Sequence, residues 1–213
     1  MHLILVRHAE SKHSQQDIIA DISGCSGLTQ HGFEQAQLFA NRLRTTGELN
    51  DCHSMLCSPV LRDKQTAQVI AKGIPVNMVK QDDALCELRP GDADGLSWQE
   101  YREKFGAFDL IGSPCRPFAP HGESWLEFIG RVRDTLERLA SEYENQSVMV
   151  ITHAGFIVAS LLVLFDIPRP GTGAYFDPVH TSLTEWHKTN GIWQLAKYND
   201  SWHLPTIAQR TNP

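Results

Sequence analysis

Two short apolar runs, far apart in the sequence, each end at a histidine. Residues 3–6 are followed by Arg7 and His8, and residues 148–152 are followed by His153. Short runs rich in β-branched residues are typical of buried strands. In an open parallel sheet, ligands bind in the crevice beyond the carboxyl ends of the strands. If both runs are parallel strands, both histidines and Arg7 face one crevice. Imidazole and guanidinium groups at such a place suit a dianionic phosphate.

Predicted strands and helices alternate along the chain, which favours an α/β fold. Strands are expected at 3–6, 55–57, 76–79 and 148–152, and helices at 30–43, 59–72, 98–105 and 125–139. Between about 88 and 122 the pattern is irregular and contains several prolines, which we interpret as a lid over the crevice. We therefore expect a three-layer αβα sandwich with a mainly parallel sheet and a small lid insertion. Residues 1–213 are expected to form a single domain.

Local signals predict where some of these elements begin. Ser58 and Pro59 have the pattern of an N-cap followed by the first helical residue. Ser124 and Glu127 are spaced as a capping box at the start of the long helix. The Asn-Gly pair at 190–191 lies between two alternating stretches and predicts a hairpin. Residues 11–27 lack a periodic pattern and are interpreted as an active-site loop.

Charge and hydropathy exclude some classes of partner. The chain has 213 residues and a net charge of −6, with no basic run, which argues against nucleic-acid binding. No cationic segment followed by a long apolar stretch occurs near Met1, so no signal peptide is expected. Residues 148–165 are nearly long enough to cross a bilayer, but they contain His153 and divide at Gly155. We therefore expect a buried strand, turn and helix there, and no membrane partner.

The cysteines indicate a reducing compartment. There are five of them, an odd number, and no Cys-x-x-Cys occurs. Buried or incidental thiols in a cytoplasmic protein fit this pattern best. The chain also has ten histidines, but no group of histidines and cysteines has the usual spacing of zinc ligands. No metal site is therefore expected from the sequence.

Three further residues have both a structural and a functional interpretation. Arg62 falls in the first turn of the helix after Ser58, where an anion is favoured, although a solvated arginine is common there. Glu87 follows an apolar stretch and precedes a glycine-containing loop, and is either a strand-end carboxylate or part of the site. His153 lies between an apolar strand and an apolar helix, where a polar side chain needs partners.

Six blocks of sequence, taken together, resemble those of the histidine phosphatase superfamily, the phosphoglycerate-mutase-like fold. The blocks are residues 5–11, 28–32, 58–62 with 66–67, 85–87 with 91 and 94–95, 122–124, and 150–155. Each block alone is a weak signal. All six follow the family's order and span roughly residues 3–165, which makes the resemblance specific.

The resemblance implies a role for each of the five polar residues. His8 would be the nucleophile that forms a phosphohistidine. Arg7, Arg62 and His153 would hold the phosphoryl oxygens and stabilise the charge of the transition state. Glu87 would protonate the leaving oxygen and then deprotonate the attacking water. The reaction would need no metal or other cofactor.

The resemblance also implies positions that contact the substrate, and here the chain departs from the family. Ser14 stands where many relatives have a phosphate-contacting Asn, and Ala154 replaces a usual Gly. With Gly24, these residues are expected to bind the substrate. A further set is expected to lie at the surface or to pack in the lid and core rather than to contact substrate. It comprises His13, Arg89, His121, His180, Trp98, Tyr101 and Trp125.

These expectations lead to a metal-independent phosphomonoesterase that acts on a small phosphorylated metabolite. The first alternative is a cofactor-dependent phosphoglycerate mutase, which would use the same phosphohistidine. Mutases of this kind resemble longer chains with a larger insertion and C-terminal segment, whereas the present stretch between Glu87 and Gly122 is short. The second alternative is a non-enzyme that only binds phosphorylated ligands. The physiological substrate and the oligomeric state stay open.

Overall fold

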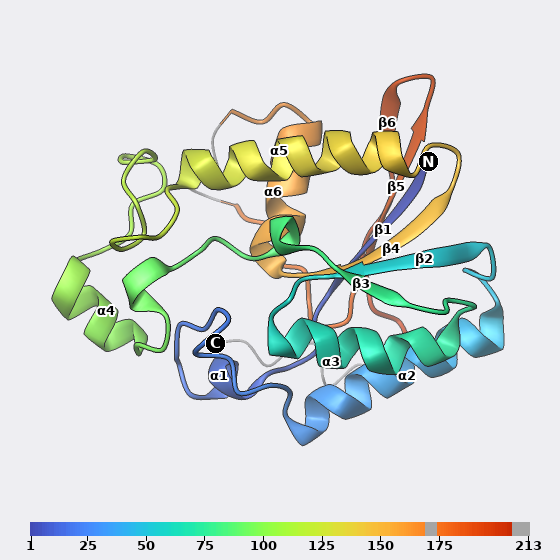
Figure 1. The fold of residues 1–213 in the computed structure, drawn as a ribbon, viewed down its shortest axis with the longest axis horizontal. Helices are drawn as coiled ribbons and strands as arrows, with labels where there is room; N and C mark the ends of the chain where they lie inside the picture. Colours follow the sequence, from blue (N-terminus) through green and yellow to red (C-terminus); the bar gives the residue numbers. More distant parts are fainter. Residues whose placement is uncertain (169–173, 206–213) are drawn as a thin grey trace.

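The computed structural model describes residues 1–168 and 174–205, so part of the C-terminal tail lies outside it (Figure 1). Within these residues the strands form a single sheet in the order β3-β2-β4-β1-β5-β6. The strands are β1 (His2–Arg7), β2 (Cys52–Cys57), β3 (Val79–Gln81), β4 (Ser147–Thr152), β5 (Leu183–Thr189) and β6 (Ile192–Asp200). The first four are parallel to one another, β5 is antiparallel to β1, and β6 is antiparallel to β5. The predicted α/β fold with a mainly parallel sheet is confirmed.

Helices cover both faces of this sheet, with α2 and α3 on one side and α5 on the other (Figure 1). The α-helices are α1 (Lys12–Gln15), α2 (Gln30–Thr46), α3 (Leu61–Ile70), α4 (Trp98–Phe105), α5 (Trp125–Glu142) and α6 (Ala154–Leu164). Short 3₁₀ helices span Ala71–Gly73, Asp83–Leu85 and Gly91–Ala93.

The two faces follow from the alternation of side chains along β1. Ile4 and Val6 belong to the apolar cluster with α2 and α3, whereas Leu3 and Leu5 belong to the cluster with α5 and α6. Successive residues of a strand point to opposite faces, so a continuous apolar run is needed where both faces are buried. The central position of β1 therefore fixes His8 at the middle of the sheet's carboxyl edge.

Some element boundaries differ from the prediction. Ser58 is not an N-cap: α3 begins at Leu61, because Val60 is extended, and the Ser58 hydroxyl accepts the Val60 N–H at 3.3 Å. The strand expected at 76–79 begins at Val79, where pairing with Met55 of β2 starts. The active-site loop contains one short helix, α1, that its sequence did not indicate.

Other local predictions are confirmed. The Ser124 hydroxyl accepts the Glu127 N–H at 3.3 Å, and the Glu127 carboxylate accepts the Ser124 N–H at 2.8 Å. Asn190 and Gly191 join β5 to β6 with φ angles of 52° and 80°. Positive φ at both positions is the geometry of the hairpin turn that Asn-Gly favours.

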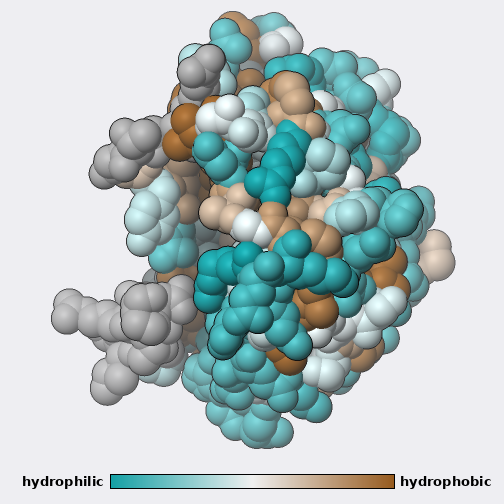
Figure 2. All heavy atoms as spheres, turned by 90° about the vertical axis from the view of Figure 1, so that its left-hand side faces the viewer, coloured by the Kyte–Doolittle hydropathy of each residue, from teal (hydrophilic) through white to brown (hydrophobic). Residues whose placement is uncertain are grey.

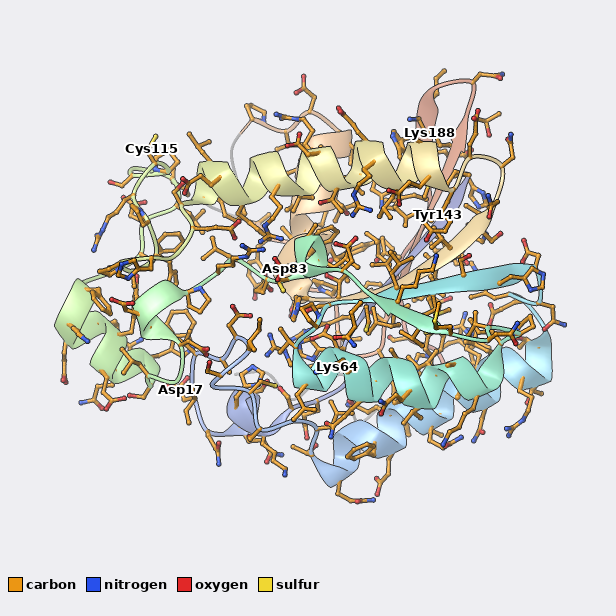
Figure 3. All side chains as sticks on the ribbon, in the orientation of Figure 1. Asp17, Lys64, Asp83, Cys115, Tyr143 and Lys188 are labelled. Carbon is orange, nitrogen blue, oxygen red and sulfur yellow. The ribbon has the colours of Figure 1, made fainter. Side chains whose placement is uncertain are left out.

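The lid carries α4 and has a small core of its own. Tyr101 stacks on Phe118 with ring centroids 4.4 Å apart and donates a hydrogen bond to the Phe118 carbonyl. Ile19 joins this core, and its N–H donates to the Leu96 carbonyl at 2.8 Å. Asp17 lies where the active-site loop meets the lid (Figure 3). The lid is thus held to the loop that follows His8.

The stretch considered as a membrane span forms β4 and α6 instead. Among the residues that the structure describes, no helix combines the length and the apolar character needed to cross a membrane.

Candidate active site

The parallel pairing of β1 with β4 brings the two histidines together. Arg7 is in register with Thr152, and the His8 N–H donates to the Thr152 carbonyl at 2.8 Å. His8 and His153 therefore follow directly from two adjacent strand ends. Their rings are edge to face, with centroids 5.3 Å apart. This is the juxtaposition that the two apolar runs predicted.

The guanidinium of Arg62 links both rings. Its Nε donates to His8 Nε2 at 3.0 Å, and Nη2 lies 3.0 Å from His153 Nδ1. Nη1 donates to the Ala20 carbonyl at 2.9 Å. Arginine has no acceptor atom, so both histidine nitrogens must accept. The remaining nitrogen of His8, Nδ1, is 2.8 Å from the Ala9 carbonyl and carries the ring proton. His8 is thereby held with the Nε2 lone pair toward Arg62.

Burial and positive neighbours keep both rings neutral. Burial lowers the pKa of His8 well below its ordinary value, and the charge of Arg62 lowers it further. Burial and Arg62 have the same effect on the pKa of His153. A neutral imidazole is the form that can attack phosphorus, so His8 is competent as a nucleophile at neutral pH and below.

A buried carboxyl group lies behind His153. His153 Nε2 is 3.1 Å from the Ser58 hydroxyl and 3.4 Å from an Asp63 oxygen. Because Nδ1 accepts from Arg62, Nε2 carries the proton and points at this pair. The Asp63 side chain is fully buried, and burial raises its pKa well above the ordinary value. The Ser58 hydroxyl therefore orients His153, and the Asp63 oxygens lie beside this contact without a hydrogen-bond partner of their own.

Arg7 and Glu87 occupy the other edges of the site. Arg7 Nη1 donates to the Pro178 carbonyl at 2.6 Å. One oxygen of Glu87 accepts the Gly155 N–H at 2.8 Å, and the other accepts the Leu88 N–H at 3.1 Å. A Cβ at Gly155 would lie only 2.1 Å from Glu87 Oε1, so a glycine is needed for this approach. The first turn of α6 thus positions the carboxylate.

These groups border a cavity of about 430 Å³. The predicted site residues that line it are Arg7, His8, Ser14, Arg62, Glu87 and Ala154. His153 does not line it but lies behind Arg62. Gly24 is also outside the lining, and its N–H donates to Asp94 Oδ1 at 3.0 Å.

The side of the cavity away from the histidines is largely apolar. The lid contributes Trp98, Phe108 and Phe118, and α5 contributes Trp125 and Phe128. Seen from the side of α4, hydrophobic side chains lie between hydrophilic surfaces (Figure 2). Trp98 and Trp125 pack against neighbouring aromatic rings, as expected, and they also line the cavity. Tyr101 is buried in the lid core as expected.

Two histidines that the sequence did not assign to the site lie next to His8. The ring of His180 is 5.7 Å from that of His8, and the ring of His13 is 6.4 Å away. His180 comes just before β5, the antiparallel neighbour of β1, and no short-range motif marks it. By contrast, His121 pairs with Asp92 and Arg89 pairs with Asp83, outside the cavity lining. Asp63 could have been found, because it shares a helical face with the apolar residues at 67 and 70.

Comparison with known proteins agrees with this geometry. The model of the histidine phosphatase superfamily, branch 1, matches residues 3–201. The chain is 28% identical over 210 residues to the metal-independent phosphoserine phosphatase of Arabidopsis thaliana, covering 96% of this chain and 84% of that protein. It is 30% identical over 168 residues to the putative phosphoserine phosphatase 2 of Hydrogenobacter thermophilus, covering 78% and 79%. The chain belongs to the histidine phosphatase superfamily, and the prediction of a phosphatase enzyme is confirmed at that level.

The fold is shared with solved structures of lower sequence identity. YhfR from Bacillus stearothermophilus superposes with a TM-score of 0.81 over 95% of this chain and 98% of that one, at 23% identity. The overall fold is therefore one already seen in solved structures.

Proposed function

We propose that the protein is a metal-independent phosphomonoesterase that hydrolyses a small phosphorylated metabolite. The observation that carries this proposal is the hydrogen bond from Arg62 to His8 Nε2, which leaves a neutral nucleophile beside two guanidinium groups. The Nε2 lone pair attacks phosphorus and the P–O bond to the leaving alcohol breaks. Water then attacks the phosphohistidine, and the P–N bond breaks to release phosphate.

Each polar group has a part in these two steps. Arg7 and Arg62 hold the phosphoryl oxygens, and a bound phosphate takes over the donors that Arg62 turns toward the histidines. His153 stabilises the phosphoryl group through the placement of Arg62. Glu87 gives its proton to the leaving oxygen and later takes one from the water. Ser14 and Ala154 contact the substrate, while Gly24 supports the loop through Asp94.

The cavity favours hydrolysis over the mutase alternative. Among the described residues that line it, Arg7 and Arg62 are the only lysines or arginines, and both face the phosphate position. A phosphoglycerate would need a further cation for its carboxylate, and the aromatic wall offers none. The non-enzyme alternative is disfavoured because four of the five expected groups line the cavity, and the fifth, His153, contacts Arg62 behind it. In the reaction itself, the two enzymatic candidates differ in the acceptor of the phosphoryl group, which is water for the phosphatase and a second hydroxyl for the mutase.

The proposed intermediate is tested by chemical quenching. Enzyme mixed with a ³²P-labelled aryl phosphate and quenched during turnover is expected to carry one acid-labile, base-stable phosphate. Peptide mapping should place the label on His8. Label on a serine or an aspartate, or none during rapid turnover, would contradict the mechanism. Label that passes to a phosphoglycerate faster than to water would favour the mutase.

The aromatic wall predicts a preference for leaving groups with an apolar body. We expect kcat/KM for naphthyl phosphate to exceed that for phosphoserine by about tenfold or more, since burial of apolar surface stabilises binding. Replacing Trp98 with alanine should reduce this preference, because Trp98 lines the cavity. The control is Trp202→Ala, at an exposed tryptophan that does not line it. Equal kcat/KM values for both substrates would show that the wall does not select the substrate.

We also propose that the protein is located in the cytoplasm. The five cysteines are free, and four of them are buried, with Cys115 exposed in the lid (Figure 3). Free thiols are usual in a reducing compartment, which supports a cytoplasmic location.

A further inference from the structure

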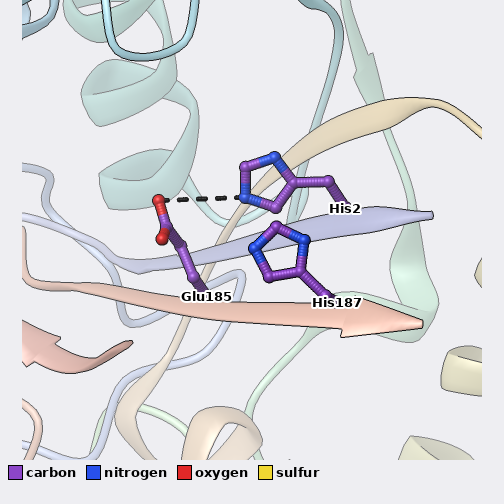
Figure 4. Close-up of side chains that lie close together, drawn as sticks. All are labelled: His2, Glu185 and His187. Carbon is purple, nitrogen blue, oxygen red and sulfur yellow. Dashed lines mark ion pairs between the residues drawn. The ribbon is translucent and has the colours of Figure 1, made fainter. Parts of the chain in front are cut away.

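Three side chains that can bind a metal lie together at the end of the sheet opposite the cavity. His2 begins β1 and pairs with His187 of β5, and Glu185 is two residues from His187 on the same face (Figure 4). Their ligand atoms all lie within 4.8 Å of one another. Two imidazoles and a carboxylate are a donor set that zinc uses. Side-chain rotations are needed to bring these atoms to coordination distance.

The hydrogen bonds around His2 leave one nitrogen facing an acceptor. The Ser147 hydroxyl donates its single proton to Asp51 Oδ2 at 2.6 Å, so it can only accept from His2 Nδ1, which is 3.4 Å away. In the neutral ring, Nε2 is then a bare lone pair. It is buried without a hydrogen-bond partner and lies 3.8 Å from Glu185 Oε1 (Figure 4). A lone pair opposite a carboxylate is unfavourable unless a proton or a metal ion lies between them.

The second imidazole lies directly against the first. His187 stacks on His2 with ring centroids 4.4 Å apart and an interplanar angle of 11°. The backbone pairing of His2 with His187 keeps both side chains on one face of the sheet, beside Glu185. The lone pair of an imidazole nitrogen lies in the ring plane, so the two rings must turn out of this parallel stack to bind one ion.

One protein cation competes for the carboxylate. Lys197 Nζ lies 3.3 Å from Glu185 and 3.8 Å from Glu48. When a metal takes the Glu185 oxygens, the ammonium keeps Glu48 as a partner. Lys197 therefore weakens metal binding without preventing it.

We infer that His2, Glu185 and His187 bind a divalent transition-metal ion, zinc in particular, with water completing the coordination. The spacing of histidines and cysteines did not indicate this site, because its ligands come from opposite ends of the chain. Five residue steps along β1 separate His2 from Arg7, roughly 17 Å in a strand. The ion would therefore join the start of β1 to β5 and stabilise the sheet, outside the phosphatase reaction.

The test is calorimetric titration of the tag-free full chain with ZnCl₂ at pH 7.5. The wild type is expected to bind one ion. His187→Gln should weaken binding by about tenfold or more, because loss of even a hydrogen-bond partner of a metal ligand lowers metal affinity by about that factor. The matched control is His53→Gln, at an exposed histidine of β2, which should bind as the wild type does. Lys197→Gln should tighten binding. Melting curves without metal establish that each variant is folded.

Three results would overturn the inference. The first is no binding by the wild type, which would leave His2 and Glu185 as an ion pair. The second is equal binding by the wild type and His187→Gln. The third is binding that is lost in His8→Ala but kept in His187→Gln, which would place the ion in the phosphatase cavity. The expected chelator effect is separate: EDTA should lower the melting temperature of zinc-loaded protein and leave phosphate release unchanged.

Discussion

Replacing His8 with alanine is expected to lower turnover of an aryl phosphate by about 10⁴-fold or more, because loss of the nucleophile removes the covalent route. The rest of the site stays in place, since Arg62 keeps its bonds to His153 and to the Ala20 carbonyl. Binding of phosphate or vanadate should therefore survive while turnover is lost. Steady-state phosphate release and a binding titration measure the two quantities separately.

A matched control distinguishes this loss from general damage to the fold. His31→Ala changes an exposed histidine of α2, and its turnover should equal that of the wild type. Thermal unfolding of both variants tests whether the sheet is intact. If His8→Ala retained wild-type turnover, His8 could not be the nucleophile. If it lost phosphate binding as well, the ring would serve mainly to position Arg62.

The sequence was informative where strand order determines position. His8 and His153 each follow an apolar run, and parallel pairing of Arg7 with Thr152 makes their adjacency a consequence of topology. The position of Arg62 in a helix predicted that it lies near an anion. Its hydrogen bonds to both histidine rings could not be predicted. Such contacts depend on how α3 packs on the sheet, and no local sequence pattern predicts that packing.

The rest of the site depends on tertiary packing. His180 reaches His8 only because β5 adds antiparallel to β1, a pairing that the hairpin signal does not specify. Trp98 lines the cavity because the lid core orients α4, and the sequence pattern predicts the helix but not the direction of its face. The start of α3 was misplaced because Ser58 turns its hydroxyl toward His153 instead of capping a helix.

Replacing Glu87 with glutamine is expected to have the second largest effect, and its size should depend on the leaving group. For an alkyl phosphate, kcat/KM of the variant should be about 10²- to 10⁴-fold below that of the wild type, which is the range for removal of a general acid. A nitrophenyl phosphate should lose far less, because nitrophenolate leaves without protonation. Hydrolysis of the phosphohistidine also needs Glu87 as a base. Rapid mixing should therefore show a burst of nitrophenol with accumulated phosphoenzyme.

Glutamine separates proton transfer from positioning at this site. The Glu87 carboxylate accepts the Gly155 and Leu88 N–H groups, and the carbonyl of a glutamine can still accept from Gly155. The start of α6 should therefore stay in place while the transferable proton is removed. Glu103→Gln, at an exposed carboxylate of α4, is the control and should match the wild type. Equal losses on both substrates without a burst would mean that Glu87 orients the site rather than moving a proton.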